Sequence, residues 1–120
     1  YPDLFSRWRA TPPATISGSA RGWRGQFVQE YGDPQENPGF WNAISPDSYL
    51  GDLSGPIQLH HAEGDETVPV LFSQLLYEKA QAQGAPVELY TYPGDNHNLN
   101  TNFSTAMART IEFFDRYLKN

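Results

Sequence analysis

The 120-residue sequence contains no cysteine, which excludes disulfides, thiolate metal sites and a cysteine nucleophile. No apolar run approaches the roughly 18 residues of a membrane span, and the N-terminus has no signal-peptide pattern. A glycine-rich phosphate loop is also missing. We therefore expect no cofactor and no membrane partner. The compartment stays open, with the cytoplasm favoured.

Positive charge is scarce beyond the first part of the chain. The net charge is −6, but residues 1–29 carry four arginines against one aspartate, a net +3. Residues 30–120 carry thirteen acids against four cations, a net −9. An acidic body argues against a nucleic-acid partner, because phosphate binding needs clustered cations. A solvated or interface-forming surface is the expected role of the early arginines, Arg7, Arg9, Arg21 and Arg24.

The chain also lacks an initiator methionine, so we expect it to be part of a longer one. Its length allows at most one domain, and 14% aromatic residues favour a folded protein. Residues 1–44 read as an irregular lead-in, with short helices expected around 24–31 and 40–43. Residues 45–120 carry the more regular pattern.

Two segments in that second part repeat one arrangement, a strand pattern followed by an acidic loop with a glycine. The strands are expected at residues 57–62 and 87–92. Between them, apolar residues at helical spacing end before Gly84, which predicts a helix. A last helix follows, capped by Asn100 or Asn102. This order predicts an α/β fold with parallel strands.

Asp65 and His97 occupy the loops after these two strands. Because the carboxyl ends of neighbouring parallel strands share one crevice, the two side chains should meet there, at about 2.6–3.2 Å. An imidazole with a pKa near 6.5 can take and return a proton near neutral pH. A carboxylate on its other nitrogen fixes the tautomer. Asp65 and His97 are thus two thirds of an acyl-transfer triad, yet no G-x-S-x-G occurs in the sequence.

Other carboxylates compete with Asp65 for this role. Glu66 is expected to enter the N-terminus of the following helix, and Asp95 is too close to His97 in sequence to reach its ring. Glu63 is the third rival. The loop position favours Asp65.

The adjacent residues His60 and His61 point to opposite faces of a strand, so they cannot both bind one metal. His61 is expected to pack under the sheet, and His60 to be a satisfied core or helix-facing group. The three tryptophans, Trp8, Trp23 and Trp41, are expected in packing roles. A mixed metal site remains an alternative, with the ligands His61, Glu63, Asp65 and His97.

Several motifs together point to a known family. They are Ser45-Pro46, Pro56-Ile57-Gln58-Leu59, Gly64-Asp65-Glu66-Thr67-Val68-Pro69, Ser73, Val87-Glu88-Leu89-Tyr90, Tyr92-Pro93-Gly94-Asp95-Asn96-His97 and Phe113-Phe114-Asp115-Arg116-Tyr117-Leu118. From about Trp41 onward, the sequence resembles the C-terminal part of a prolyl oligopeptidase-like α/β-hydrolase. This group includes dipeptidyl aminopeptidases, acylaminoacyl peptidases and related esterases. The 32-residue step from Asp65 to His97 resembles the family's spacing of acid and base.

The resemblance implies a three-layer α/β-hydrolase sandwich of parallel strands with flanking helices. It also implies that Asp65 is the triad acid and His97 the general base, acting on peptide or ester bonds. The family's order of serine, aspartate and histidine places the nucleophile and the oxyanion hole upstream of Tyr1. Neither Ser17 nor Ser19 sits in a strand–turn–helix elbow, so the isolated chain is expected to be inactive.

The strand expected at residues 57–62 is nearly apolar, so we expect a further segment to cover its edge on the side away from residues 87–92. The expected partner is the N-terminal half of its own enzyme or a second copy of the chain. The alternative function is a non-catalytic α/β module that self-associates, or binds a partner, through this open edge.

Overall fold

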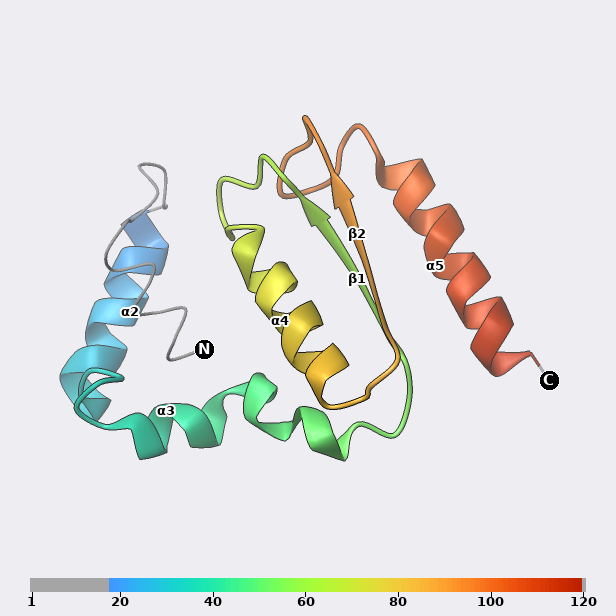
Figure 1. Ribbon diagram of the computed structural model, residues 1–120. Coiled ribbons are helices and arrows are strands. Elements are labelled where there is room, and N and C mark those ends of the chain that lie inside the picture. Colours follow the sequence, from blue (N-terminus) through green and yellow to red (C-terminus); the bar gives the residue numbers. More distant parts are fainter. Residues whose placement is uncertain (1–17, 120) are drawn as a thin grey trace. The chain divides into compact units, whose positions relative to one another are not determined.

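The computed structural model describes the backbone of residues 18–119 and the side chains of residues 25–119 (Figure 1). The chain divides into two compact units, one ending at Asp52 and the other beginning at Leu53. The side chains of Trp8, Trp23, Ser17, Ser19 and the four early arginines lie outside the described residues.

The first unit contains the helices α2 (Gly18–Tyr31) and α3 (Pro38–Ile44) and the 3-10 segment η1 (Pro46–Asp52). Gly32 ends α2 with a φ of 80°, a conformation that glycine adopts without strain. Asn37 caps α3 by accepting a hydrogen bond from the backbone N–H of Phe40. The indole N–H of Trp41 donates to the Gly32 carbonyl oxygen at 2.9 Å. The helix α2 starts earlier than the sequence pattern predicted.

The second unit begins with a pair of parallel strands, β1 (Ile57–Ala62) and β2 (Val87–Tyr92). Their bounds agree with the predicted ones, and Ile57 is in register with Val87. Within the described residues the sheet has only these two strands, so the other edge of β1 has no strand beside it.

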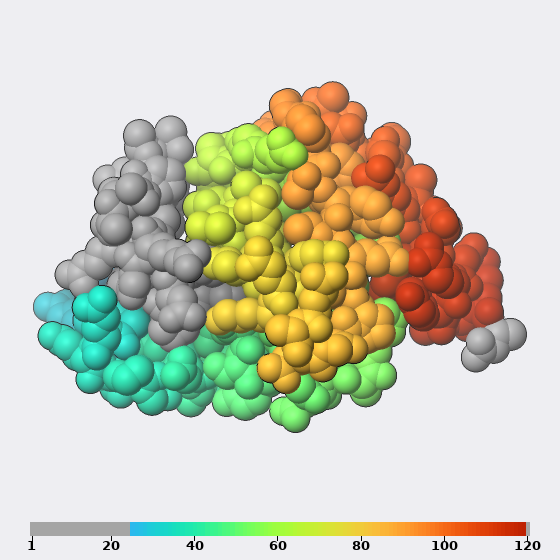
Figure 2. Space-filling model, in the orientation of Figure 1, coloured from blue at the N-terminus to red at the C-terminus, as the bar shows by residue number. Residues whose placement is uncertain are grey.

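Two helices, α4 (Leu71–Ala82) and α5 (Phe103–Leu118), cover opposite faces of the strands. His61 bonds to Ser73 of α4, whereas the preceding residue, His60, contacts Thr110 of α5. Since consecutive strand residues point to opposite faces, the second unit is layered as helix, sheet and helix. In the space-filling view, α4 (yellow) lies against the orange segment that contains β2 (Figure 2).

Local sequence explains where these helices begin and end. Gly84, with a φ of 75°, ends α4, and the N–H of Ala85 returns to the Ala80 carbonyl at 3.0 Å. Asn102 precedes α5, but its side chain does not cap the helix. None of the described helices is both long enough and apolar enough to span a membrane.

Candidate active site

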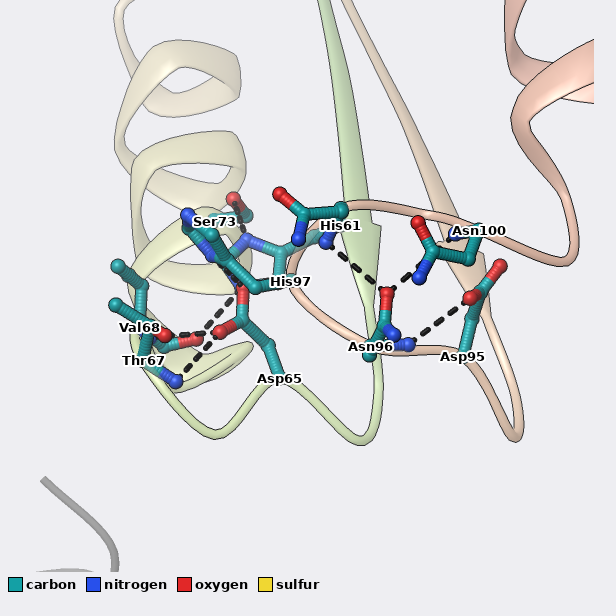
Figure 3. Close-up of polar contacts among 10 residues, drawn as sticks. His61, Asp65, Thr67, Val68, Ser73, Asp95, Asn96, His97 and Asn100 are labelled. Carbon is teal, nitrogen blue, oxygen red and sulfur yellow. Dashed lines mark hydrogen bonds and ion pairs between the residues drawn. The ribbon is translucent and has the colours of Figure 1, made fainter.

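Asp65 organises the loop between β1 and α4, residues 63–70, which we call the acid loop. One carboxylate oxygen, Oδ1, accepts the backbone N–H groups of Thr67 and Val68, each at 2.8 Å. The side chain of Asp65 is only 4% exposed. These bonds hold its second oxygen, Oδ2, in a fixed direction (Figure 3).

Asp95 organises the loop between β2 and α5, residues 93–102, which we call the base loop. Its buried carboxylate accepts the backbone N–H groups of Asn96, Thr101 and Asn102 and the side-chain amide of Asn102. Gly94 and Leu99 have positive φ values of 71° and 53°. The loop therefore folds back on Asp95 and presents His97 at its outer side.

The two loops meet at Asp65 and His97. The Nδ1 atom of His97 lies 2.8 Å from Oδ2 of Asp65, within the distance expected from the sequence. Because a carboxylate can only accept, Nδ1 carries the proton and donates it. The side chain of His97 is 43% exposed, and within the described residues its other ring nitrogen makes no hydrogen bond.

Hydrogen bonds keep Asp65 ionised despite its burial. Burial alone raises the pKa of this carboxyl, but the bonds from the Val68 N–H, the His97 ring and the Thr67 N–H outweigh it. The pKa of Asp65 consequently lies below its ordinary value. The anionic Oδ2 of Asp65 accepts the Nδ1–H of His97 and so fixes the tautomer of the ring.

A second histidine, His61, also reaches Asp65. Its Nε2 atom lies 3.2 Å from Oδ2 of Asp65 and 2.8 Å from the carbonyl oxygen of Val68. Its Nδ1 atom lies 2.7 Å from the hydroxyl of Ser73. The prediction that His61 packs under the sheet holds, since it is buried against α4, but sequence reasoning missed its contact with the acid.

The rival carboxylates make other contacts. Glu63 accepts a hydrogen bond from the Thr91 hydroxyl at 2.8 Å, and Asp95 accepts hydrogen bonds from residues of its own loop. Glu66 stays exposed in the acid loop and precedes α4, so the prediction that it enters the helix is wrong. The helix α4 begins at Leu71, after Pro69, and the Asp65 carboxylate accepts the backbone N–H groups of Thr67 and Val68 ahead of it.

The metal alternative finds no support in the part of the chain that is described. No group of three or more His, Cys, Asp or Glu side chains there could hold a metal ion. The ring nitrogens of His61 and His97 that face Asp65 both carry protons, because the atoms they face accept hydrogen bonds.

His60 takes part in a separate polar network on the other face of the strands. It bonds to the hydroxyl of Tyr92 and to the side chain of Gln58, each at 2.8 Å. Burial, and then the nearby guanidinium of Arg109, hold the pKa of His60 below its ordinary value. His60 is thus the satisfied, helix-facing histidine that the strand alternation predicted.

Two further contributors were missed at the level of sequence. Asp95 was considered only as a rival acid, although its position just before a turn-rich loop is typical of a residue that bonds local backbone. Gly64 entered the sequence analysis only as the glycine of an acidic loop. A Cβ atom there would lie 2.8 Å from the carbonyl oxygen of Asp95, so the glycine lets the two loops approach.

The fold and the site together define a class of protein. Two parallel strands carry a hydrogen-bonded aspartate and histidine on the loops after their carboxyl ends, where α/β proteins bind their ligands. The sequence profile of the prolyl oligopeptidase family matches residues 14–120. The chain belongs to the prolyl oligopeptidase family, a lineage of serine peptidases and related hydrolases.

Proposed function

We propose that this chain supplies the acid and the general base of a Ser-Asp-His triad, in a hydrolase that cleaves peptide or ester bonds. Asp65 is the acid and His97 is the base. The observation that carries the proposal is the 2.8 Å contact between Oδ2 of Asp65 and Nδ1 of His97, on loops after two neighbouring parallel strands.

The geometry suits this chemistry in two respects. The acid is buried and ionised, so it holds one tautomer of the ring and stabilises the imidazolium that forms. The base is partly exposed, so its Nε2 atom is open to a serine hydroxyl. His97 would take the proton of that hydroxyl during attack and return it to the leaving amine or alcohol.

The nucleophile is proposed to lie upstream of Tyr1, because the family's order is serine, aspartate, histidine. No G-x-S-x-G occurs in the sequence to provide a nucleophile elbow. Without a nucleophile and its oxyanion-hole amides, the chain would hydrolyse nothing by itself. The three-layer sandwich of the whole fold would then be completed by the upstream segment.

One surface of the second unit supports this assembly. Around α5, Arg109 and Arg116 reach Tyr90 and Glu88 of β2, whereas Thr110 reaches β1. Successive residues of an α-helix are rotated by about 100° around its axis. Because Arg109 faces β2 and Thr110 faces β1, the face of α5 beyond Thr110 extends past β1, over its open edge. That face carries an exposed apolar stripe: Phe103, Met107, Ile111, Phe114 and Leu118.

An apolar helix face beside an unpaired strand edge is what a further strand would cover. We therefore favour the nucleophile-bearing N-terminal half of the same enzyme as the partner, with a second copy of the chain as the alternative. The same surface also favours the second candidate function, a non-catalytic module that associates through this edge.

The test is to express the reading frame that encloses the chain and treat it with a fluorophosphonate probe, which labels an activated serine. The proposal predicts one labelled serine in a G-x-S-x-G upstream of residue 1, with labelling lost in His97→Ala. If the enclosing reading frame contains no such serine, or if labelling is unchanged in His97→Ala, the proposal fails. The non-catalytic binding module is then the favoured function.

A further inference from the structure

His61 is the one buried histidine whose contacts run directly into the candidate site (Figure 3). Its ring lies between the hydroxyl of Ser73 on one side and the acid loop on the other. The acid–base mechanism proposed above uses only Asp65 and His97, so the role of this ring is not yet assigned.

The partners of His61 determine its tautomer. The Val68 carbonyl, 2.8 Å from Nε2, can only accept, so Nε2 must carry a proton. In the neutral ring Nδ1 is then an acceptor, and the Ser73 hydroxyl, 2.7 Å away, donates to it. The Nε2–H group also lies 3.2 Å from Oδ2 of Asp65, the oxygen that receives the His97 proton.

These contacts restrain Asp65 in two ways. Directly, the Nε2 atom of His61 lies 3.2 Å from Oδ2 of the anionic carboxylate, while its N–H group bonds to the Val68 carbonyl. Indirectly, His61 holds the carbonyl of Val68, whose own N–H group donates to Oδ1 of Asp65. Val68 is therefore fixed at both of its backbone polar groups, and the acid loop is closed around the carboxylate.

We propose that His61 is a positioning residue for the Asp65–His97 pair, held by Ser73 as the Nε2–H tautomer. The inference rests on the proposed function for its catalytic meaning, but its geometric part stands alone. Through Ser73, His61, Asp65 and His97, a hydroxyl on α4 helps to set the orientation of the base.

Ser73 is not proposed as a nucleophile, although a serine, a histidine and an aspartate are in line. The His61 nitrogen that faces the acid is also bonded to Val68, and the ring is buried. Ser73 lies in the first turn of a helix rather than on a strand–helix elbow.

Ring nitrogen NMR of the ¹⁵N-histidine-labelled chain tests the tautomer directly, because the sequence contains only three histidines. The proposal predicts the Nε2–H form for His61 and the Nδ1–H form for His97. Ser73→Ala should convert His61 to a mixture of tautomers and weaken the Nδ1–H signal of His97. Ser73→Thr retains the hydroxyl and should keep both signals.

A matched control is Thr110→Ala, which removes a helix hydroxyl 3.3 Å from His60 on the opposite face. It should leave the signals of His61 and His97 in place. The His61→Gln variant retains a donor near the Nε2 position and provides a second, independent substitution. It should preserve the Nδ1–H signal of His97 better than His61→Ala does.

In the assembled hydrolase, Ser73→Ala should lower kcat about fivefold with KM within twofold, the size of one ordinary hydrogen bond, and Ser73→Thr should restore it. A His61 ring in the Nδ1–H or doubly protonated form would overturn the proposal, as would a His97 signal unmoved by Ser73→Ala. Failure of His97→Ala to abolish hydrolysis would instead overturn the proposed function and leave the tautomer result standing.

Discussion

Gly64 of the acid loop lies directly against the carbonyl oxygen of Asp95 in the base loop, leaving no room for a side chain. An added Cβ would come within 2.8 Å of that oxygen. The backbone oxygen cannot rotate away, so the loops themselves would have to separate. This contact sets the distance between the loops that carry Asp65 and His97.

Gly64→Ala is therefore expected to destabilise the chain by about 1–3 kcal/mol, the usual cost of overpacking, and to weaken the Asp65–His97 bond. Urea unfolding measures the first effect and the His97 Nδ1–H signal the second. Gly55→Ala is the control, since a Cβ there meets nothing within 4 Å. Equal stability of the two variants would contradict this role for Gly64.

Asp95→Asn is expected to reduce the dependence of stability on pH below about pH 4. Burial opposes ionisation of this carboxyl, but its hydrogen bonds to Asn102, Thr101 and Asn96 outweigh that effect and lower its pKa. A carboxyl with a lowered native pKa adds stability above its unfolded pKa, and this is lost as the pH falls through the native pKa.

Urea unfolding at pH 7 and between pH 4 and 2 checks this expectation for Asp95. The variant should be less stable at pH 7 and should lose stability less steeply in acid. Asp115→Asn, which changes an exposed carboxylate on α5, should leave the profile close to that of the parent chain. If the stability of Asp95→Asn falls between pH 4 and 2 as steeply as that of the parent chain, Asp95 is not the source of this pH dependence.

Arg109→Gln is expected to raise the pKa of His60 while leaving it below 6.5. Burial is the larger cause of the lowered pKa and the Arg109 charge the second, so removing the charge recovers only part of the shift. A histidine NMR titration measures this, with Lys119→Gln as a control for a cation at the end of α5. A His60 pKa that falls or stays the same in Arg109→Gln would show that the Arg109 charge does not lower this pKa.

Ile111→Lys is expected to weaken association of the chain with the proposed partner, because it places a charge in the exposed apolar stripe of α5. Light scattering of the 13.5 kDa chain, alone and with the upstream segment, measures the assembly. Ala108→Lys places the same charge outside the stripe and should not interfere. If both variants assemble like the parent chain, the stripe is not the interface.

Local sequence signals were sufficient to predict the two strands and the contact between Asp65 and His97. Prolines and glycines bound both strands, and parallel order alone brings the loops after them together. The start of α2 was not predictable in this way, because Gly18 and Ser19 favour a turn over a helix. Its observed start shows that propensity was overridden there.

The contributions of His61 and Asp95 depend on distances that sequence does not contain. Strand alternation placed His60 and His61 on opposite faces, but the bond of His61 to Ser73 requires the position and register of α4 on one of them. The role of Asp95 requires the base loop to fold back on itself, with Leu99 at a positive φ that a leucine rarely adopts. Tertiary packing, rather than a local pattern, fixes both.

The central claim is that Asp65 and His97 act as acid and base, and the kcat of two variants of the active assembly tests it most directly. His97→Ala should lower kcat at least about a thousandfold, and Asp65→Asn about ten-thousandfold through the wrong tautomer, each with little change in KM. Glu63→Gln, which changes the exposed carboxylate bonded to Thr91, is the control and should retain normal turnover. Near-normal kcat in either His97→Ala or Asp65→Asn would contradict the account.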